Sequence, residues 1–208
     1  MAAAGSPARA APFNIGAPIS PLAALRSLPF PIGSQPKPIG LLGASAGAHL
    51  AALAALSGKK FLGAYPFAAT DTSVKALVGV YGVYDMYAMW CSLQVQDGRN
   101  ADNKVEKCIG APPMANRQTY FDASPISYAT YANNGIGVLL ATGTNDDLVD
   151  PKSQTEPFQL ALKQAGFFVR PCIVPSAPHY WMNDLIEEPA SLSGFLAPRL
   201  VRFLAERL

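Results

Sequence analysis

Gly43-Ala44-Ser45-Ala46-Gly47 joins a short apolar segment, residues 38–42, to an Ala/Leu-rich segment, residues 48–56. The flanking patterns predict a buried strand and a helix, with the pentapeptide as the turn between them. In that context a G-x-S-x-G motif predicts a sharp turn that holds its serine in a strained backbone conformation. Glycine at positions 43 and 47 would remove the side chains that collide across such a turn. Ser45 is therefore our candidate nucleophile.

Two other interpretations of this segment compete with that one. A bare G-x-S-x-G match is frequently accidental in an Ala-rich chain. Residues 38–58 also lack charged side chains, and Gly43 and Gly47 form the G-x-x-x-G spacing of packed membrane helices. Glycines, serines and a histidine interrupt the segment, however, and no aromatic belt flanks it. We therefore expect no membrane span.

The composition is that of one folded domain. Half of the 208 residues are apolar and only 14% are charged, which argues against disorder over most of the chain. The net charge of +2 is not gathered in a Lys/Arg cluster, so we expect no nucleic-acid partner. With two histidines and no C-x-x-C motif, the sequence has no zinc pattern, and we expect neither a metal site nor another cofactor.

The cysteines and the N-terminal segment carry information about the cellular compartment of the protein. Cys91, Cys108 and Cys172 favour free thiols, with a Cys91–Cys108 bridge as the alternative in an oxidising environment. Residues 1–36 are rich in Ala and Pro and predict a partly disordered segment ahead of a domain at residues 37–208. They lack the compact apolar core of a signal peptide, which slightly favours a cytoplasmic location.

The remaining strands follow from apolar runs. Residues 76–81 and 137–142 are continuously apolar, as expected for strands covered on both faces in a parallel sheet. Residues 167–174 predict a further strand, which Pro171 places at a sheet edge or an irregular end.

Helices are expected between and after these strands. Residues 152–165 and 191–208 have amphipathic spacing, and we expect Pro198 to mark the start of the main helix in the second. The alternation of strands and helices predicts an α/β domain with a parallel sheet. Residues 87–134 break the rhythm and predict an insertion, which serves either as a lid or substrate wall or as a plain surface excursion.

A nucleophilic serine needs a base, and the base needs an orienting carboxylate. His49 lies four residues after Ser45 on the same predicted helix and cannot reach over the hydroxyl, so we interpret it as a packing or surface residue. His179 lies in the loop after the last predicted strand, where α/β sheets place chemistry. Of the acids after the strand at 137–142, Asp146 is our choice for the orienting carboxylate and Asp147 the reserve.

Four motifs in order resemble the α/β-hydrolase superfamily, specifically its hormone-sensitive-lipase-like and feruloyl-esterase-like carboxylesterases. They are the Gly43–Ala51 segment GASAGAHLA, residues 123–128 (ASPISY), residues 143–149 (GTNDDLV) and a degraded G-x-x-H signal that ends at His179. The resemblance implies a three-layer fold, with helices on both faces of the sheet, and the order Ser45, Asp146, His179. It also implies that the backbone N–H of Ala46 serves as an oxyanion donor.

The sequence departs from this family ahead of the nucleophile. Family members carry additional strands and an H-G-G loop there, and this sequence has no Gly-Gly before Ser45. An N-terminally shortened sheet would leave the strand at 39–43 with a bare edge, and we expect residues 13–19 or a second subunit, in a homodimer, to cover it. A lost oxyanion donor typically costs about 10²–10³ in turnover.

Three functions remain open from sequence. The first is a serine carboxylesterase that cleaves short acyl or carbohydrate-linked esters, small-molecule substrates, through an acyl-enzyme. The second is a peptidase of the prolyl-oligopeptidase type, which Ala46 disfavours because those enzymes usually place a bulky aromatic there. The third is a truncated, non-catalytic hydrolase domain that acts in binding or subunit interaction.

Overall fold

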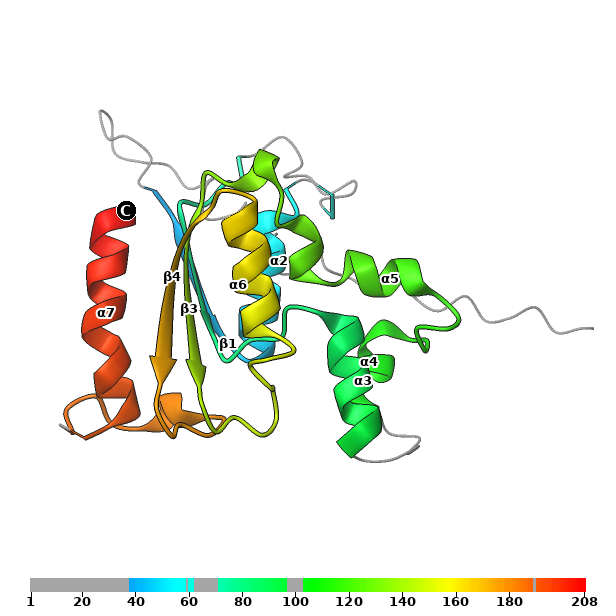
Figure 1. Ribbon diagram of the computed structural model, residues 1–208. Helices are drawn as coiled ribbons and strands as arrows, with labels where there is room; N and C mark the ends of the chain where they lie inside the picture. The colour runs from blue at the N-terminus through cyan, green and yellow to red at the C-terminus, as the bar shows by residue number, and fades with distance from the viewer. Residues whose placement is uncertain (1–37, 59, 62–70, 97–102, 189) are drawn as a thin grey trace, which may run out of the picture.

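The computed structural model describes residues 38–58, 60–61, 71–96, 103–188 and 190–208 (Figure 1). The expected disordered segment at 1–36, and with it residues 13–19, lies outside this part of the chain.

A parallel sheet with the strand order β1-β2-β3-β4 forms the centre of the molecule. Its strands are β1 (Gly40–Ala44), β2 (Ala76–Val80), β3 (Gly137–Gly143) and β4 (Phe168–Val174). The helices are α2 (Ala46–Leu56), α3 (Met86–Gln96), α4 (Lys104–Ile109), α5 (Arg117–Asp122), α6 (Thr155–Gln164) and α7 (Leu192–Arg207). The described residues also form the 3₁₀ helices η1 (Pro125–Tyr128), η2 (Tyr131–Asn133) and η3 (Trp181–Asn183).

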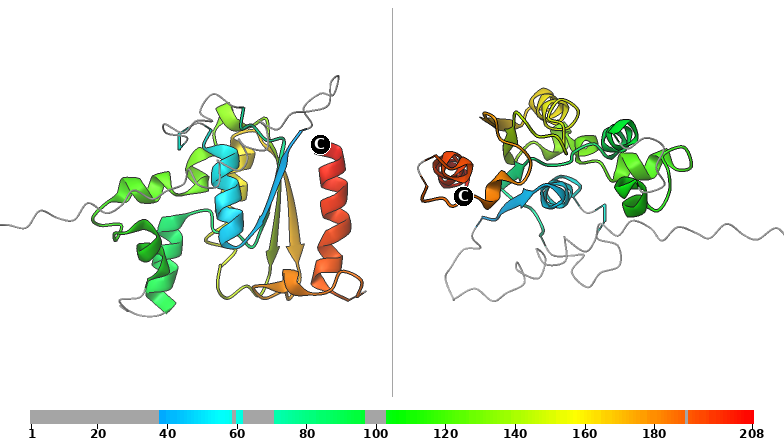
Figure 2. Two further views of the ribbon diagram at one scale, coloured as in Figure 1. Left: turned by 180° about the vertical axis from the view of Figure 1, so that it is seen from behind. Right: turned by 90° about the horizontal axis from the view of Figure 1, so that it is seen from below.

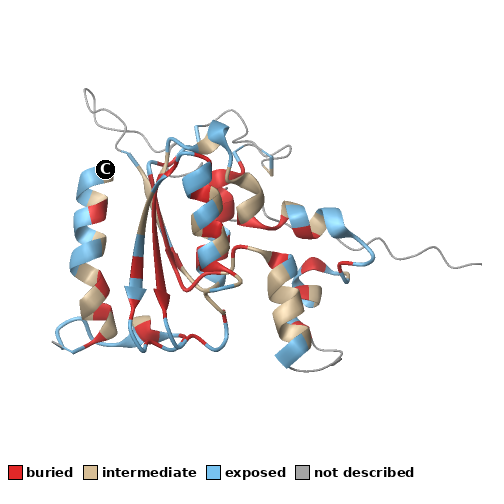
Figure 3. Cartoon of the chain, in the orientation of Figure 1, coloured by how far each residue is buried: buried red, intermediate tan, exposed pale blue. Residues whose placement is uncertain are grey.

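Alternate residues of the central strands face opposite layers of helices. On one face Val78 and Leu139 pack in the same core as Phe203 of α7. On the other face Leu77 and Leu140 share a core with residues of α2 and α6. Figures 1 and 2 show α7 on one side of the sheet and α2 with α6 on the other, and Figure 3 shows the strands buried between them. The predicted three-layer α/β fold is therefore confirmed.

The predictions for Pro171 and Pro198 had different outcomes. Pro171 lies in β4, which forms one edge of the described sheet, as predicted. The expectation for Pro198 was wrong, because Pro198 lies inside α7. That helix begins instead at Leu192, where the Ser191 hydroxyl caps it by accepting a hydrogen bond from the N–H of Gly194. The other amphipathic helix, α6, begins at Thr155 rather than at 152, since residues 151–154 form turns.

The segment at 87–134 forms short helices beside the sheet. Helices α3, α4 and α5 extend from the side that carries α2 and α6 (Figures 1 and 2). They have an apolar core of their own, in which Met86, Val105 and Tyr120 pack with Leu53 of α2. The three cysteines are free thiols, as the sequence favoured.

Candidate active site

Ser45 occupies the turn between β1 and α2. Its φ of 52° and ψ of −122° are a conformation that a non-glycine residue adopts only when the surrounding structure holds it there. The Ser45 N–H donates to the carbonyl of Val80 at 2.9 Å, so the end of β2 holds the turn in place. A Cβ at Gly43 would overlap the backbone of Gly47 and Ala48, and the turn therefore requires glycine at 43.

The expected steric need for the second glycine was wrong. Among the described residues, a Cβ built on Gly47 would meet no atom within 4 Å. The close packing of the turn therefore requires glycine at position 43 but not at position 47.

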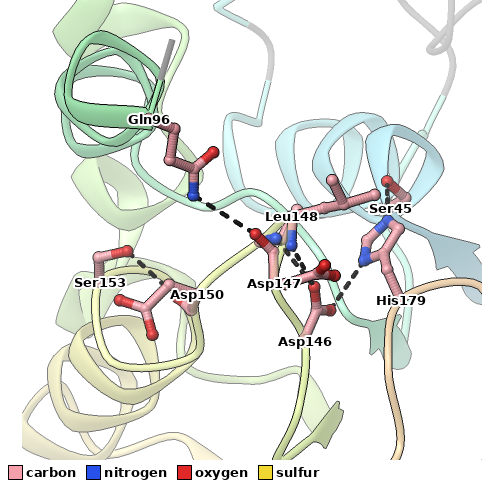
Figure 4. A network of polar contacts seen from close by, with 9 residues as sticks. Ser45, Gln96, Asp146, Asp147, Leu148, Asp150, Ser153 and His179 are labelled. Carbon is pink, nitrogen blue, oxygen red and sulfur yellow. Dashed lines mark hydrogen bonds and ion pairs between the residues drawn. The ribbon is translucent and has the colours of Figure 1, made fainter. Parts of the chain in front are cut away.

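Three side chains from three different strand ends meet in one hydrogen-bonded chain (Figure 4). His179 Nε2 lies 2.9 Å from Ser45 Oγ, and His179 Nδ1 lies 2.8 Å from Asp146 Oδ2. An ionised carboxylate only accepts hydrogen bonds, so Nδ1–H donates to Asp146 and Nε2 accepts from the Ser45 hydroxyl. The imidazole is therefore oriented to take the serine proton.

The carboxylate is itself fixed by the loop that follows β3. Asp146 is buried, and its Oδ1 accepts hydrogen bonds from the N–H groups of Leu148 at 3.1 Å and Val149 at 2.9 Å. The reserve candidate, Asp147, is exposed and lies outside the chain of hydrogen bonds. Asp150 accepts from the N–H of Lys152 at 3.1 Å, as a turn-capping residue does.

His49 has the packing role that the sequence indicated. It is buried, and its Nε2 donates to the carbonyl of Ala123 at 2.7 Å, which ties α2 to the end of α5. Burial lowers the pKa of His49, which keeps the ring neutral at neutral pH.

A cavity of about 260 Å³ opens beside the serine. Ser45, Ala46 and His179 line one part of it. The inserted helices contribute an apolar wall made by Met86, Met89, Leu93 and Val105, and the loop after Asp146 adds Leu148 and Val149. Gln96, at the end of α3, donates to the carbonyl of Asp147 at 3.3 Å and so connects the insertion with the acid loop (Figure 4).

The residue predicted to bind an oxyanion also lies at this cavity. Ala46 is the first residue of α2, and N–H groups in the first turn of a helix lack intrahelical partners. Such a group favours negative charge next to the serine.

The described ranges contain no group of three or more His, Cys, Asp or Glu side chains placed to hold a metal ion. Across the same residues, every helix is too short or too polar to cross a membrane.

Sequence reasoning overlooked one residue next to His179. Tyr81 follows β2 directly, and its ring centroid lies 4.6 Å from that of the imidazole. Its position at the carboxyl end of an apolar strand was the signal that could have drawn attention to it.

A parallel sheet between two layers of helices, with Ser45, Asp146 and His179 after the ends of β1, β3 and β4, defines an α/β-hydrolase domain. The model of the BD-FAE family matches residues 32–162, and the chain belongs to that family.

Several known proteins that are similar in sequence or structure are esterases. Esterase LipQ of Mycobacterium tuberculosis is 37% identical over 142 residues, which cover 64% of this chain but 30% of the relative. A truncated carbohydrate esterase from gut microbiota superposes with a TM-score of 0.71 at 20% identity, covering 92% of this chain and 67% of the other. Esterase 2 of Thermogutta terrifontis with bound butyrate gives a TM-score of 0.68 at 19% identity, covering 92% and 64%. This chain therefore spans about a third of the length of its curated relative.

Proposed function

We propose that the chain is a serine carboxylesterase. Ser45 attacks the ester carbonyl while His179 takes the hydroxyl proton, which gives a tetrahedral intermediate with a negatively charged oxygen. The carbonyl then re-forms, the bond to the alkoxy group breaks, and that group leaves as the alcohol with the proton that His179 returns. Water, activated by the same imidazole, then hydrolyses the acyl-enzyme and restores Ser45. The observation that carries the proposal is the unbroken hydrogen-bonded chain from Ser45 through His179 to Asp146.

Asp146 and Ala46 have supporting roles in this mechanism. The buried carboxylate holds the imidazole in the required tautomer and stabilises the imidazolium that forms. The N–H of Ala46 donates to the developing oxyanion, and it is the one donor that we assign.

The cavity and the relatives support a substrate class for this proposal. The apolar wall of the cavity suits the hydrocarbon part of an ester, and about 260 Å³ accommodates a short acyl chain better than a long one. Similarity to an esterase with bound butyrate and to a carbohydrate esterase favours short acyl groups or carbohydrate-linked esters. In this proposal residues 37–208 form the catalytic domain, and the insertion at 87–134 acts as the substrate wall.

Labelling with a fluorophosphonate probe tests the nucleophile directly. We expect the probe to modify Ser45, located by mass spectrometry, and the protein to hydrolyse p-nitrophenyl butyrate. Ser45→Ala should lose both reactions, whereas Ser73→Ala, at an exposed position, should retain them. A folded wild-type chain that is neither labelled nor active would favour a non-catalytic binding domain.

We also propose that the outer edge of β1 is covered by another strand. Within the described part of the chain, β1 pairs only with β2, and the side chain of Leu42 is 48% exposed. Residues 13–19 or a second copy of the chain would satisfy this edge.

A further inference from the structure

The backbone at Tyr81 is strained. Its φ is 38°, in the left-handed region that aromatic residues rarely adopt, and its side chain is only 4% exposed. Strain of this kind persists only where the surroundings determine the conformation, and it concentrates at functional sites. The Tyr81 N–H donates to the carbonyl of Ala141 at 2.8 Å, so β3 holds the strained residue in place.

The turn directs the Tyr81 side chain against the loop that carries the histidine. Its ring lies 4.6 Å from the His179 ring, centroid to centroid, at an interplanar angle of 57°. It also meets Trp181 edge-on at 5.7 Å, and its hydroxyl hydrogen-bonds the backbone of Met182. Tyr81 thus contacts His179, Trp181 and Met182 in the loop after β4.

We propose that Tyr81 is a positioning residue for His179. Its ring holds the imidazole in line between Ser45 and Asp146, and its π electrons stabilise the ring when it is protonated. The inference rests on the proposed function, because it assigns a role in the reaction of the same site.

The contacts of the imidazole support a positioning role for Tyr81. Asp146 and Ser45 occupy its two nitrogens, and the ring of Tyr180 contacts it at 4.3 Å with an angle of 80°. Tyr180 is 58% exposed, whereas Tyr81 is buried, so the fixed contact comes from Tyr81. A cation within about 6 Å of an aromatic face is stabilised, most strongly where water is excluded.

Three variants separate the ring from the hydroxyl. Tyr81→Phe keeps the ring and loses the hydrogen bond to the Met182 backbone, and we expect kcat within about threefold of wild type, since neutral hydrogen bonds contribute modestly. Tyr81→Leu removes the ring, and we expect kcat for p-nitrophenyl butyrate to fall about 10- to 100-fold with KM little changed, because misalignment acts on the transition state. Tyr131→Leu, at a residue 78% exposed, is the matched control.

Pentafluorophenylalanine at position 81 distinguishes positioning by the ring from packing. This residue keeps the ring size but reverses the charge of the ring face. The imidazole becomes charged when it takes the serine proton, so the transition state should lose the attraction that the Tyr81 ring provides. We therefore expect kcat to fall about 3- to 30-fold with KM little changed, even where Tyr81→Leu does not fold.

The NMR signal of the His179 Nδ1–H proton gives a reading that does not require turnover, because this proton lies in the hydrogen bond to Asp146. The chain has only two histidines, so His49→Gln assigns the His179 signals. If Tyr81 positions the ring, the proton should exchange faster with water in Tyr81→Leu and in the fluorinated variant. The inference is overturned if both folded variants keep the wild-type exchange rate and kcat. If exchange becomes faster while the wild type shows no Ser45-dependent hydrolysis, the contact is upheld and the proposed function fails.

Discussion

At the scale of single residues, the strained backbone conformation of Ser45 depends on the absence of a side chain at Gly43. Ser45 can hold a φ of 52° because Gly43 lets the backbone of the following helix approach it closely. Gly47 stands two residues beyond the serine in the same motif but makes no comparable approach among the described atoms. The two glycines of G-x-S-x-G therefore differ in their physical roles.

Alanine at the two glycines should have opposite effects. Gly43→Ala forces a Cβ into the backbone of α2 and should destabilise the fold by about 1–3 kcal/mol, as overpacking does. Gly47→Ala, in a helical position with free space, should be neutral or stabilising by about 0.5–1 kcal/mol. Urea denaturation followed by circular dichroism measures both, and equal losses of stability would contradict the prediction.

The sequence located the three interacting side chains because each follows a predicted strand. With two histidines in the chain, and His49 excluded by helical spacing, His179 was the remaining candidate for the base. Tyr81 also follows a strand, but that position alone does not indicate its role. Its positive φ and its contact with His179 arise from tertiary packing, which no local pattern records.

At the scale of elements, Gln154 connects the start of α6 to the loop between β2 and α3. This buried side chain precedes α6, and its Oε1 accepts from the N–H groups of Tyr84 at 2.8 Å and Asp85 at 2.9 Å. Its Nε2 donates to the carbonyl of Asp85 at 3.1 Å. One amide thus pairs three backbone groups in the loop that leads from β2 into α3.

Replacing the Gln154 side chain should lower the stability of the fold. Gln154→Leu leaves those backbone groups without a partner and should lower the free energy of unfolding by about 1–3 kcal/mol. Gln164→Leu, at the exposed end of the same helix, is the control and should change stability by less than about 0.5 kcal/mol. Thermal and urea unfolding provide the comparison, and similar behaviour of the two variants would refute the assignment.

Element prediction succeeded where burial alone determines the pattern. β2 and β3 are buried throughout, and their apolar runs read directly as strands. It failed at Pro198, since capping by Ser191 and packing of α7 on the sheet outweigh one lost backbone hydrogen bond. The helices of the insertion were unpredicted because their apolar residues serve a separate small core and the cavity wall rather than a single face.

At the scale of the whole molecule, the proposed covering of the β1 edge by a second copy or by residues 13–19 can be tested. Leu42 is half-exposed on this edge strand. If a second copy pairs there, sedimentation velocity should show a dimer at micromolar concentration, and Leu42→Lys should shift it toward monomer. Leu160→Lys, on exposed α6, should leave the association unchanged. A wild-type monomer would instead favour coverage by residues 13–19, which deletion of that segment would then expose.

The Ser45–His179 hydrogen bond joins residues 134 positions apart in the chain. In the proposed mechanism, Ser45 is activated only when the loop after β4 has docked beside the end of β1. Fluorophosphonate labelling would therefore report that the tertiary fold has formed, and not merely the local turn at Ser45.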